Sequence, residues 1–340
     1  MAARSKSRPP AGTHLRHAAR APRGRRVLRI RAKYSKRNDA TLRCGDSKRF
    51  LASLPDDSAQ LVITSPPYNL GKAYERKAKL DEYLNFQRQI IAECVRITRD
   101  GGSICWQVGN SILKNREILP LDTLIHPLFA EHRESCGIRL RNRIVWHFEH
   151  GLHCSQRFSG RYETILWYTV GDPYLFNLDP VRVPQKYPGK KHYQGNNRGK
   201  PSGNPLGKNP GDFWVFRAEE DRSDVWVFPN VKGNHVEKTD HPCQFPIELP
   251  ARLILALSEE GDLVVDPFVG VGTTTAAAVL LRRRAAGVDR LREYVETARR
   301  RARAVASGRL RYRAIGKPVY EPRPNTPLTT PPPGFVNHKG

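Results

Sequence analysis

The chain has 340 residues, six scattered cysteines and a formal net charge of +25 at pH 7. No stretch approaches the roughly 20 apolar residues of a membrane-spanning helix, so we expect a soluble protein. The cysteines form no CxxC pair, which argues against a disulfide framework or a zinc knuckle and favours a reducing compartment. An excess of positive charge this large favours a polyanionic partner, of which nucleic acid is the commonest.

The two ends of the chain are predicted to be tails. Residues 1–38 carry thirteen Lys or Arg and no Asp or Glu, with Pro9 and Pro10 among small residues. Such a segment cannot bury enough apolar surface to fold alone, so we expect a disordered basic arm that could lie along phosphates. A transit peptide has a similar composition, but the early prolines disrupt its amphipathic helix. A second tail is expected over residues 307–340, which are rich in proline.

Short apolar runs alternate with helical patterns between the tails. The predicted strands are residues 40–44, 59–64, 103–108, 143–148, 164–170, 262–266 and 285–289. Apolar spacing predicts helices over residues 80–98, 246–260, 273–284 and 291–306. Alternation of this kind indicates an α/β sheet.

The middle of the chain breaks this rhythm. Residues 186–211, here called the basic loop, are rich in Lys, Gly, Asn and Pro and contain no acidic residue. A compact core rarely holds a loop this long without a functional reason. The basic loop is therefore expected to serve function rather than folding.

Residues 64–70, with the sequence TSPPYNL, follow directly on a predicted strand. Two consecutive prolines can neither extend a strand nor lie inside a helix, so the chain must turn there. This corner would display Ser65 and Tyr68 rigidly at the end of the strand. Taken alone, the segment is equally typical of a proline turn before a loop.

Residues 263–281 predict a ligand-binding turn. A buried strand ends at Asp266, Gly270 and Gly272 follow in a tight loop, and an alanine-rich helix comes next. Glycine lets backbone approach a ligand where any Cβ would clash, although a turn that only packs helix on strand would look similar. The next predicted strand ends at Asp289, a carboxylate suited to ribose hydroxyls. Neither a third motif glycine nor a P-loop lysine follows, which favours a nucleoside ligand without phosphates.

Together, TSPPY at residues 64–68 and DPFVGVGTT at residues 266–274 resemble the amino-methyltransferases of DNA, which methylate the exocyclic amine of cytosine or adenine. The catalytic motif comes before the cofactor motif, an order similar to that of the permuted beta class. The resemblance covers most of residues 40–306. It implies a Rossmann-like, doubly wound sheet with strand 262–266 central, strand 59–64 beside it, and both loops at the carboxyl edge.

The resemblance implies roles for three groups of residues. The catalytic set would be Ser65, Pro66, Pro67 and Tyr68. S-adenosylmethionine would be bound by Asp46, Asp266, Phe268, Gly270, Gly272, Thr273 and Asp289. In the basic loop, DNA would be bound by Lys186, Lys190, Lys191, Arg198, Lys200 and Lys208. No metal is expected, because the donor already carries its activation as a sulfonium.

Residues 241–249, with the sequence HPCQFPIEL, look like the family segment that precedes the cofactor strand. Phe245 stands where relatives often carry a lysine, and Val271 stands where many carry a serine. The first replacement removes a charge and the second a hydroxyl that could contact the cofactor. Valine at 271 keeps the shape of the glycine loop.

The motif order divides the chain into three functional parts. Residues 39–170 would form the catalytic half, residues 171–240 an inserted target-recognition region, and residues 241–306 the cofactor-binding half. The expected partner is double-stranded DNA in a bacterial cytoplasm. The sequence leaves open whether a restriction endonuclease accompanies the protein, and it leaves open the oligomeric state.

The resemblance also implies how the corner acts. The target amine is a poor nucleophile, because its lone pair is delocalised into the ring. If Ser65 Oγ and the carbonyl of Pro66 accept hydrogen bonds from the amine, its lone pair can point at the methyl group, which is positioning rather than covalent chemistry. Tyr68 would offer a π face to the base once it has left the duplex.

The target base and the reaction class each have alternatives. Relatives with Asp at the position of Ser65 mostly act on adenine, whereas Ser favours cytosine N4, so site-specific N4 methylation is predicted and adenine N6 is the alternative. The same basic surface would serve an RNA methyltransferase or a protein that binds without turnover. Pro242-Cys243-Gln244 is similar to the nucleophile triplet of C5-cytosine methyltransferases. In those enzymes the glycine loop precedes the cysteine, whereas here it follows, which argues against a thiolate adduct.

Overall fold

The structure is a computed structural model. It describes residues 27–71, 75, 77–113, 115–148, 153–185, 187, 189–214, 231 and 235–313. Within these ranges, no helix combines the length and the apolar character that crossing a membrane requires.

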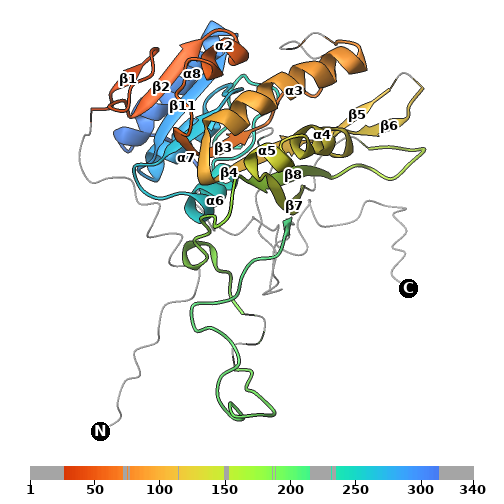
Figure 1. Cartoon of the computed structure of the whole chain (residues 1–340), viewed down its shortest axis with the longest axis vertical. Coiled ribbons are helices and arrows are strands. Elements are labelled where there is room, and N and C mark those ends of the chain that lie inside the picture. The colour runs from red at the N-terminus through yellow and green to blue at the C-terminus, as the bar shows by residue number, and fades with distance from the viewer. Residues whose placement is uncertain are drawn as a thin grey trace, which may run out of the picture.

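The described residues form a large mixed sheet with the strand order β1-β2-β11-β10-β3-β4-β8-β7-β9 (Figure 1). Its strands are β1 (Ile30–Arg31), β2 (Ala40–Cys44), β3 (Ala59–Thr64), β4 (Thr98–Val108), β7 (Arg139–His147), β8 (Tyr162–Thr169), β9 (Phe213–Trp214), β10 (Leu263–Asp266) and β11 (Arg284–Asp289). All strands from β1 to β4 in this order run parallel, whereas β8 is antiparallel to both of its neighbours. As expected, β10 is central and β3 pairs with it.

Helices cover both faces of the sheet. The helices of one face are α2 (Ser47–Leu51), α3 (Leu80–Ile97) and α4 (Leu121–Ala130), and those of the other are α6 (Glu248–Leu257), α7 (Thr273–Leu280) and α8 (Arg292–Ala306). Side chains alternate along a strand, so Leu61 and Ile63 pack in the core under α6 to α8 while Val62 packs in the core under α3. This three-layer arrangement confirms the predicted doubly wound α/β fold.

Most predicted elements lie within a few residues of the observed ones, and the exceptions have local causes. The strand predicted over residues 103–108 begins five residues earlier, because α3 ends at Ile97 and β4 starts at Thr98, with Gly101 and Gly102 inside it. The Thr98 hydroxyl donates to the carbonyl of Cys94 (2.6 Å) where the backbone turns to an extended conformation. Helix α4 was not predicted, because Pro127 lies inside it and reads as a helix breaker.

Three short elements connect the larger ones. A two-stranded hairpin of β5 (Asn110–Ile112) and β6 (Ile118–Pro120) follows β4, and the short helix α5 (Arg133–Cys136) precedes β7. A 3₁₀ turn, Asp179–Val181, leads toward the basic loop. No periodic pattern announces elements this short, and none of them was predicted.

Both expected tails are partly folded where the structure describes them. Ile30 in β1 pairs with Ala40 in β2, so residues 27–38 belong to the sheet edge, while residues 1–26 lie outside the described residues. Beyond α8, Leu310 packs against the core and Arg313 forms an ion pair with Glu248 (2.8 Å). The folded part of each predicted tail is short and mixes polar with apolar residues, so its sequence shows no strand or helix periodicity.

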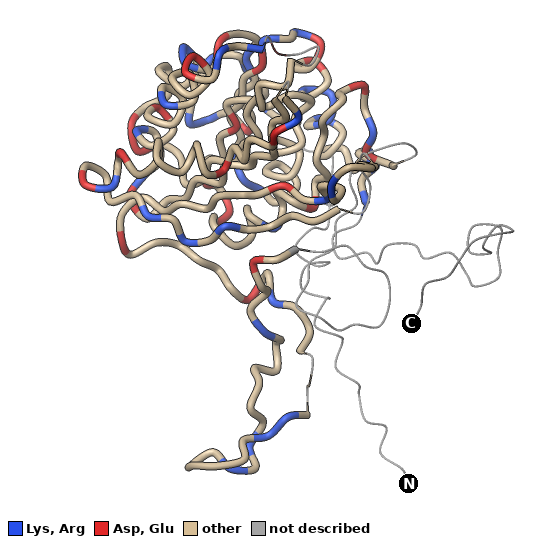
Figure 2. The backbone as a smooth tube through the Cα atoms, turned by 90° about the vertical axis from the view of Figure 1, so that its right-hand side faces the viewer, with Lys and Arg blue, Asp and Glu red and all other residues tan. Residues whose placement is uncertain are grey.

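The basic loop extends away from the α/β body in both views (Figures 1 and 2). Its base is a backbone bridge in which Val183 and Lys208 each donate an N–H to the carbonyl of the other (3.0 and 2.9 Å). Farther out, the N–H of His192 donates to the carbonyl of Lys200 (3.0 Å). Backbone hydrogen bonds within the loop hold it in shape, whereas the helices of the α/β body are held by side-chain packing.

Candidate active site

Both sequence motifs lie at the same edge of the sheet. The parallel pairing of β3 with β10, of β10 with β11 and of β11 with β2 brings the carboxyl ends of these strands together. The TSPPY corner leaves β3 there, and the glycine loop (residues 267–272) leaves β10. Ligands of doubly wound folds bind at this edge, which makes it the candidate site.

A direct hydrogen bond joins the two motifs. Thr64 Oγ1 donates to Asp266 Oδ1 (2.8 Å) across 202 positions of sequence, and the N–H of Phe268 donates to the same oxygen (3.1 Å). Asp266 is buried, and this desolvation raises the pKa of its carboxyl from 3.8 to about 6. Its carboxylate thus braces the junction of the two loops; the cofactor contact expected of it stays a prediction.

Asp289 holds the glycine loop from the neighbouring strand. Its Oδ2 accepts the N–H of Gly270 (3.1 Å) and its Oδ1 accepts the N–H of Leu291 (2.8 Å). Burial raises the pKa of this carboxyl as well. The carboxylate is therefore fixed at the end of β11, where a ribose acceptor was predicted.

The two glycines of the loop have different constraints. Gly270 and Gly272 both adopt positive φ, +47° and +78°, which side chains other than glycine rarely tolerate. A Cβ on Gly272 would lie 2.5 Å from Ala298 Cβ of α8, whereas one on Gly270 would meet only the ring of His241 at 3.4 Å. Close packing on α8 thus requires glycine at 272, whereas at the buried Gly270 only the left-handed backbone requires it.

A buried arginine supports the loop from below. Arg301 of α8 donates through Nη1 to the carbonyl of Val271 (2.9 Å) and to Thr273 Oγ1 (3.1 Å). Burial lowers the pKa of its guanidinium to about 10. In the sequence, Arg301 lies in an arginine-rich stretch of the predicted helix 291–306, where no motif distinguishes it from its neighbours. The Thr273 hydroxyl, predicted to bind the cofactor, is used in this support.

Residues 45–47 complete the cofactor side of the edge. The N–H of Gly45 donates to the carbonyl of Asp289 (2.9 Å), and Ser47 Oγ donates to the carbonyl of Pro267 (2.7 Å). Asp46 caps α2 by accepting the N–H of Arg49 (3.0 Å). All the predicted cofactor residues thus lie along one edge, although β2 and β10 are far apart in sequence.

This edge fits a nucleoside ligand. Asp46 and Asp289 supply carboxylate acceptors, and the Phe268 ring meets the edge of Phe86 at 6.0 Å to form an apolar wall. A hollow of about 470 Å³ is lined by Leu291, Arg292 and Glu293, which follow Asp289 in the chain. These residues include neither the lysine nor the anion-binding loop that phosphates would need. Their carboxylates suit the hydroxyl and amino groups of S-adenosylmethionine, which donate hydrogen bonds.

The TSPPY corner is held by side chains from two strands, β4 and β8. Ser65 Oγ and Tyr68 Oη are 2.9 Å apart, and Tyr68 Oη donates to Glu163 Oε2 on β8 (3.1 Å). Gln107 Nε2 on β4 donates to the same oxygen (2.5 Å). Sequence reasoning missed Glu163 and Gln107, because each lies in an ordinary strand pattern with no motif around it.

The loop after the corner is closed by its own polar groups. The side chain of Asn69 exchanges two hydrogen bonds with the backbone of Ala78 (2.7 and 2.9 Å). Glu75 accepts the N–H groups of Asn69 and Leu70 (2.9 and 2.8 Å). Pro66 is buried and Tyr68 is half-buried. These hydrogen bonds tie the backbone after the corner to Glu75 and Ala78.

The segment before α6 also reaches the edge. The ring of His241 packs edge-on against Tyr294 at 4.7 Å, and the Cys243 N–H donates to His241 Nδ1 (3.1 Å). Phe245 packs against the hydrophobic core, which explains an apolar residue where relatives often carry lysine. Within the described residues, no group of three or more His, Cys, Asp or Glu is placed to hold a metal ion.

The predicted DNA-binding residues lie apart from this edge, on the basic loop. Lys190, Lys191, Arg198 and Lys200 are exposed, and no ion pair within the described residues neutralises them. Lys208 is half-buried at the base of the loop, and Lys186 lies outside the described residues. Exposed, uncompensated charge of this kind suits phosphate contacts.

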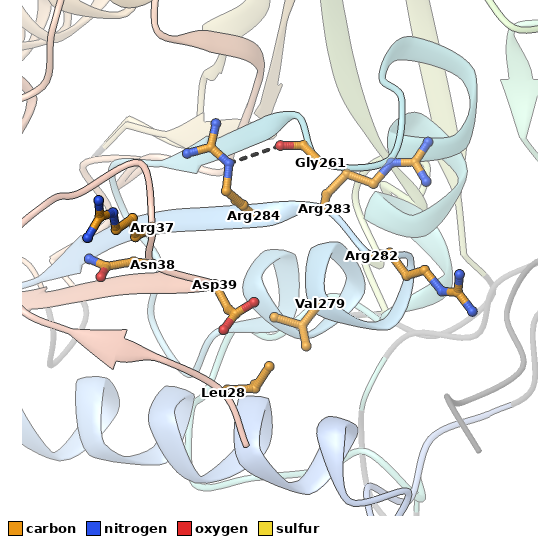
Figure 3. Close-up of a pocket in the computed structure, with 9 residues that line it drawn as sticks. All are labelled: Leu28, Arg37, Asn38, Asp39, Gly261, Val279, Arg282, Arg283 and Arg284. Carbon is orange, nitrogen blue, oxygen red and sulfur yellow. Dashed lines mark hydrogen bonds between the residues drawn. The ribbon is translucent and has the colours of Figure 1, made fainter. Parts of the chain in front are cut away.

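A separate hollow of about 280 Å³ lies at the opposite, amino edge of the sheet (Figure 3). Its arginines diverge rather than converge on the cavity. Arg284 Nε donates to the carbonyl of Gly261 (2.9 Å), and Arg283 Nη2 donates to the carbonyl of Ser258 (2.6 Å). These two guanidinium groups are used in hydrogen bonds to backbone carbonyls, so this hollow is not the candidate site.

The geometry agrees with what comparison of the sequence shows. The model of a DNA methylase family, the N6/N4 methylases, matches residues 59–300. The chain belongs to this family. The resemblance inferred from TSPPY and the glycine loop is thereby confirmed.

Named family relatives cover most of the chain. Type II methyltransferase M.BglII of Bacillus subtilis is 46% identical over 254 residues, which are 75% of this chain and 66% of that protein. M.ScaI of Streptomyces caespitosus is 35% identical over 80% of this chain and 84% of its own. DNA adenine methyltransferase YhdJ of Escherichia coli K12 is 31% identical over 76% of this chain and 80% of its own.

Solved structures show the same fold. A DNA modification methylase of Thermus thermophilus, TTHA0409, in complex with S-adenosyl-L-methionine, matches with a TM-score of 0.52 and 25% identity over 78% of this chain and 94% of that one. The cytosine-N4-specific PvuII DNA methyltransferase matches with a TM-score of 0.57 and 19% identity over 79% of this chain and 93% of that one. The expected methyltransferase fold is thus confirmed.

Proposed function

We propose that this family member transfers the methyl group of S-adenosylmethionine to the N4 amine of cytosine in duplex DNA, at a specific site. The observation that carries the proposal is the Thr64–Asp266 hydrogen bond, which fixes the catalytic corner against the glycine loop (2.8 Å). A target amine beside Ser65 and a methyl donor beside Gly270 would then share one edge. S-adenosylmethionine supplies a methyl group already activated by its sulfonium.

The protein's own residues orient and hold the reactants. Ser65 Oγ accepts a hydrogen bond from the target amine, which turns the amine's lone pair toward the methyl group. Asp289 accepts from the ribose while it keeps the glycine loop in shape. Tyr68 stacks on the extruded base, which helps to offset the few kcal/mol that base flipping costs.

The resemblance to relatives with serine at the position of Ser65, rather than the chemistry of the hydroxyl, favours cytosine. A serine hydroxyl is a neutral acceptor, and among relatives an aspartate in its place accompanies adenine. The identity to YhdJ, named a DNA adenine methyltransferase, supports adenine N6 as the second candidate. Each amine offers two N–H groups to two acceptors, so both bases are chemically compatible with this corner.

The remaining parts of the chain bind DNA and recognise the target sequence. The exposed lysines of the basic loop bind phosphates, and residues 171–240 supply target recognition between the catalytic half (39–170) and the cofactor-binding half (241–306). The names of the type II relatives support a role beside a restriction endonuclease. Double-stranded DNA is the substrate.

One experiment tests base and polymer together. The full chain is incubated with labelled S-adenosylmethionine and either mixed-sequence duplex DNA or RNA of matched sequence, and the methylated atom is identified at base resolution. N4-methylcytosine in DNA is expected. N6-methyladenine would support the second candidate, and transfer to RNA alone or no transfer at all would contradict the proposal.

A further inference from the structure

The hydroxyl of Ser65 ends a chain of hydrogen bonds that leads away from the candidate substrate position. The chain runs from Ser65 Oγ to Tyr68 Oη (2.9 Å) and on to Glu163 Oε2 (3.1 Å), where Gln107 Nε2 also donates (2.5 Å). None of the predicted site residues explains why a carboxylate lies behind the catalytic corner. Its position therefore calls for a role of its own.

The chemistry of the four groups fixes the direction of the chain. An amide nitrogen can only donate and an ionised carboxylate can only accept, and a phenol has one hydrogen. Burial, followed by the charge of Glu163, raises the pKa of Tyr68 well above its usual value, so the phenol stays neutral. Tyr68 thus gives its hydrogen to Glu163 and accepts the hydrogen of Ser65.

The strands keep these groups in place. Glu163 pairs with Trp146 of β7, and the next residue, Thr164, pairs with Val108 of β4. A Cβ on Gly109 would lie 3.1 Å from Tyr68 Cε2 and 3.5 Å from Glu163 Cγ. Glycine at 109 therefore leaves room for the tyrosine ring beside the carboxylate side chain, and a Cβ there would press against the ring.

We propose that Glu163 is a positioning residue that directs the lone pairs of Ser65 at the target amine, and that it is the final acceptor of the proton released in methyl transfer. This inference rests on the proposed function and adds to it a residue outside the catalytic motif. With the hydrogen of Ser65 engaged by Tyr68, the Oγ lone pairs face outward and can accept from the amine.

The proton balance of the reaction follows from this direction. The amine nitrogen forms a bond to the methyl carbon, the carbon–sulfur bond breaks, and its electron pair stays on sulfur. The nitrogen then carries a surplus proton. That proton moves to Ser65 Oγ as the proton of Ser65 moves to Tyr68 Oη and that of Tyr68 moves to Glu163 Oε2. The carboxylate ends neutral and later releases the proton to water.

The test compares two substitutions in the full chain, with S-adenosylmethionine and a duplex that the wild type methylates. Glu163→Gln keeps an oxygen that can accept from Tyr68 but cannot take up a proton. Its kcat is expected to fall about 10²-fold, the usual scale for loss of a general base. Donor affinity, measured by calorimetry, and the KM for duplex should change less than about twofold, because neither ligand touches Glu163.

Tyr68→Phe removes the hydroxyl but keeps the ring and should cause a similar loss of kcat. The double variant should be no slower than Tyr68→Phe alone, because both changes interrupt one chain. Glu134→Gln is the control: this exposed carboxylate lies on α5, near the end of the sheet away from the corner. It should leave kcat and thermal stability unchanged.

The outcomes separate this inference from the proposed function. Wild-type kcat in Glu163→Gln, or losses that add in the double variant, would overturn the role of Glu163 while methyl transfer itself stands. If Glu163→Gln does not fold, Tyr68→Phe decides, and full kcat in that variant overturns the relay. Absence of any transfer by the wild type would instead remove the proposed function.

Discussion

The glycine loop and the basic loop are both rich in glycine, yet the protein holds them by opposite means. The glycine loop is bound by residues that are distant in sequence: Ser47, Asp289 and Arg301 each contact its backbone. The basic loop is held by its own short-range backbone bonds, such as that between His192 and Lys200. The glycine loop is packed into the core, whereas the basic loop extends away from the core and is attached to it only at its two ends.

Two glycines make the difference concrete. Gly272 and Gly199 have nearly the same positive φ, +78° and +81°. A Cβ on Gly272 would come within 2.5 Å of Ala298, whereas nothing lies within 4 Å of one on Gly199. Glycine is thus demanded by packing in one loop and only by local backbone conformation in the other. Changes near the glycine loop should affect chemistry and stability, and changes to the lysines of the basic loop should affect DNA binding alone.

The largest effect is expected at the corner beside the glycine loop. Ser65→Ala removes the oxygen that accepts from the target amine, and kcat should fall by about 10²–10³-fold, as when one positioned hydrogen-bonding group is lost. Methyl transfer under saturating donor and duplex measures this. Ser135→Ala, an exposed serine of α5, is the control. Full activity of Ser65→Ala would remove this hydroxyl from the mechanism.

The glycine pair gives the next effect. Gly272→Ala adds both backbone strain and a clash with α8, so thermal stability and donor affinity should both fall. The free energy of unfolding should decrease by more than the roughly 1–2 kcal/mol that left-handed backbone strain alone would cost. Gly199→Ala carries the strain without the clash. Thermal melting and calorimetric titration with S-adenosylmethionine measure the difference. Equal losses in the two variants would mean that packing against Ala298 is unimportant.

The buried carboxylate at the junction should make stability depend on pH. Burial raises the pKa of Asp266 from 3.8 to about 6, so the folded protein holds this proton over a pH range in which the unfolded chain has lost it. Ionised Asp266 therefore lowers the free energy of unfolding by up to roughly 3 kcal/mol. This loss is fully present above about pH 6 and disappears as the pH falls toward 4. The melting temperature of wild type relative to Asp266→Asn should therefore rise as pH falls from 7 to 4. A constant difference would contradict the raised pKa.

The smallest effect is expected from the basic loop. Replacing Lys190, Lys191 and Lys200 with Ala should lower the slope of log affinity for DNA against log salt by about 0.9 for each phosphate that the loop no longer neutralises. Saturated kcat and thermal stability should not change, because no core group depends on these side chains. The control replaces Arg133, Arg139 and Arg303, which are exposed on α5, β7 and α8 and belong to neither the basic arm nor the basic loop. Equal slopes in the two variants would assign the loop no phosphate contacts.

The sequence predicted well wherever a short pattern has one physical meaning. Two prolines after a strand force a corner, and strand β3 ends at Thr64 as predicted. The glycines after Asp266 likewise mark a turn into α7. By contrast, Glu163, Gln107 and Arg301 were missed, because an isolated polar residue in a strand or helix has no periodic or motif signal. Only pairing with distant strands and helices gives these side chains their partners.

The sequence by itself determined the fold class, the two motifs and their order, because backbone limits on proline and glycine act within a few residues. The tertiary structure decided which side chains support those motifs. Parallel pairing of β3 and β10 brings Thr64 to Asp266, and β8 brings Glu163 behind Tyr68. Burial then sets the pKa of Asp266 and of Tyr68, and desolvation depends on every surrounding element rather than on neighbours along the chain.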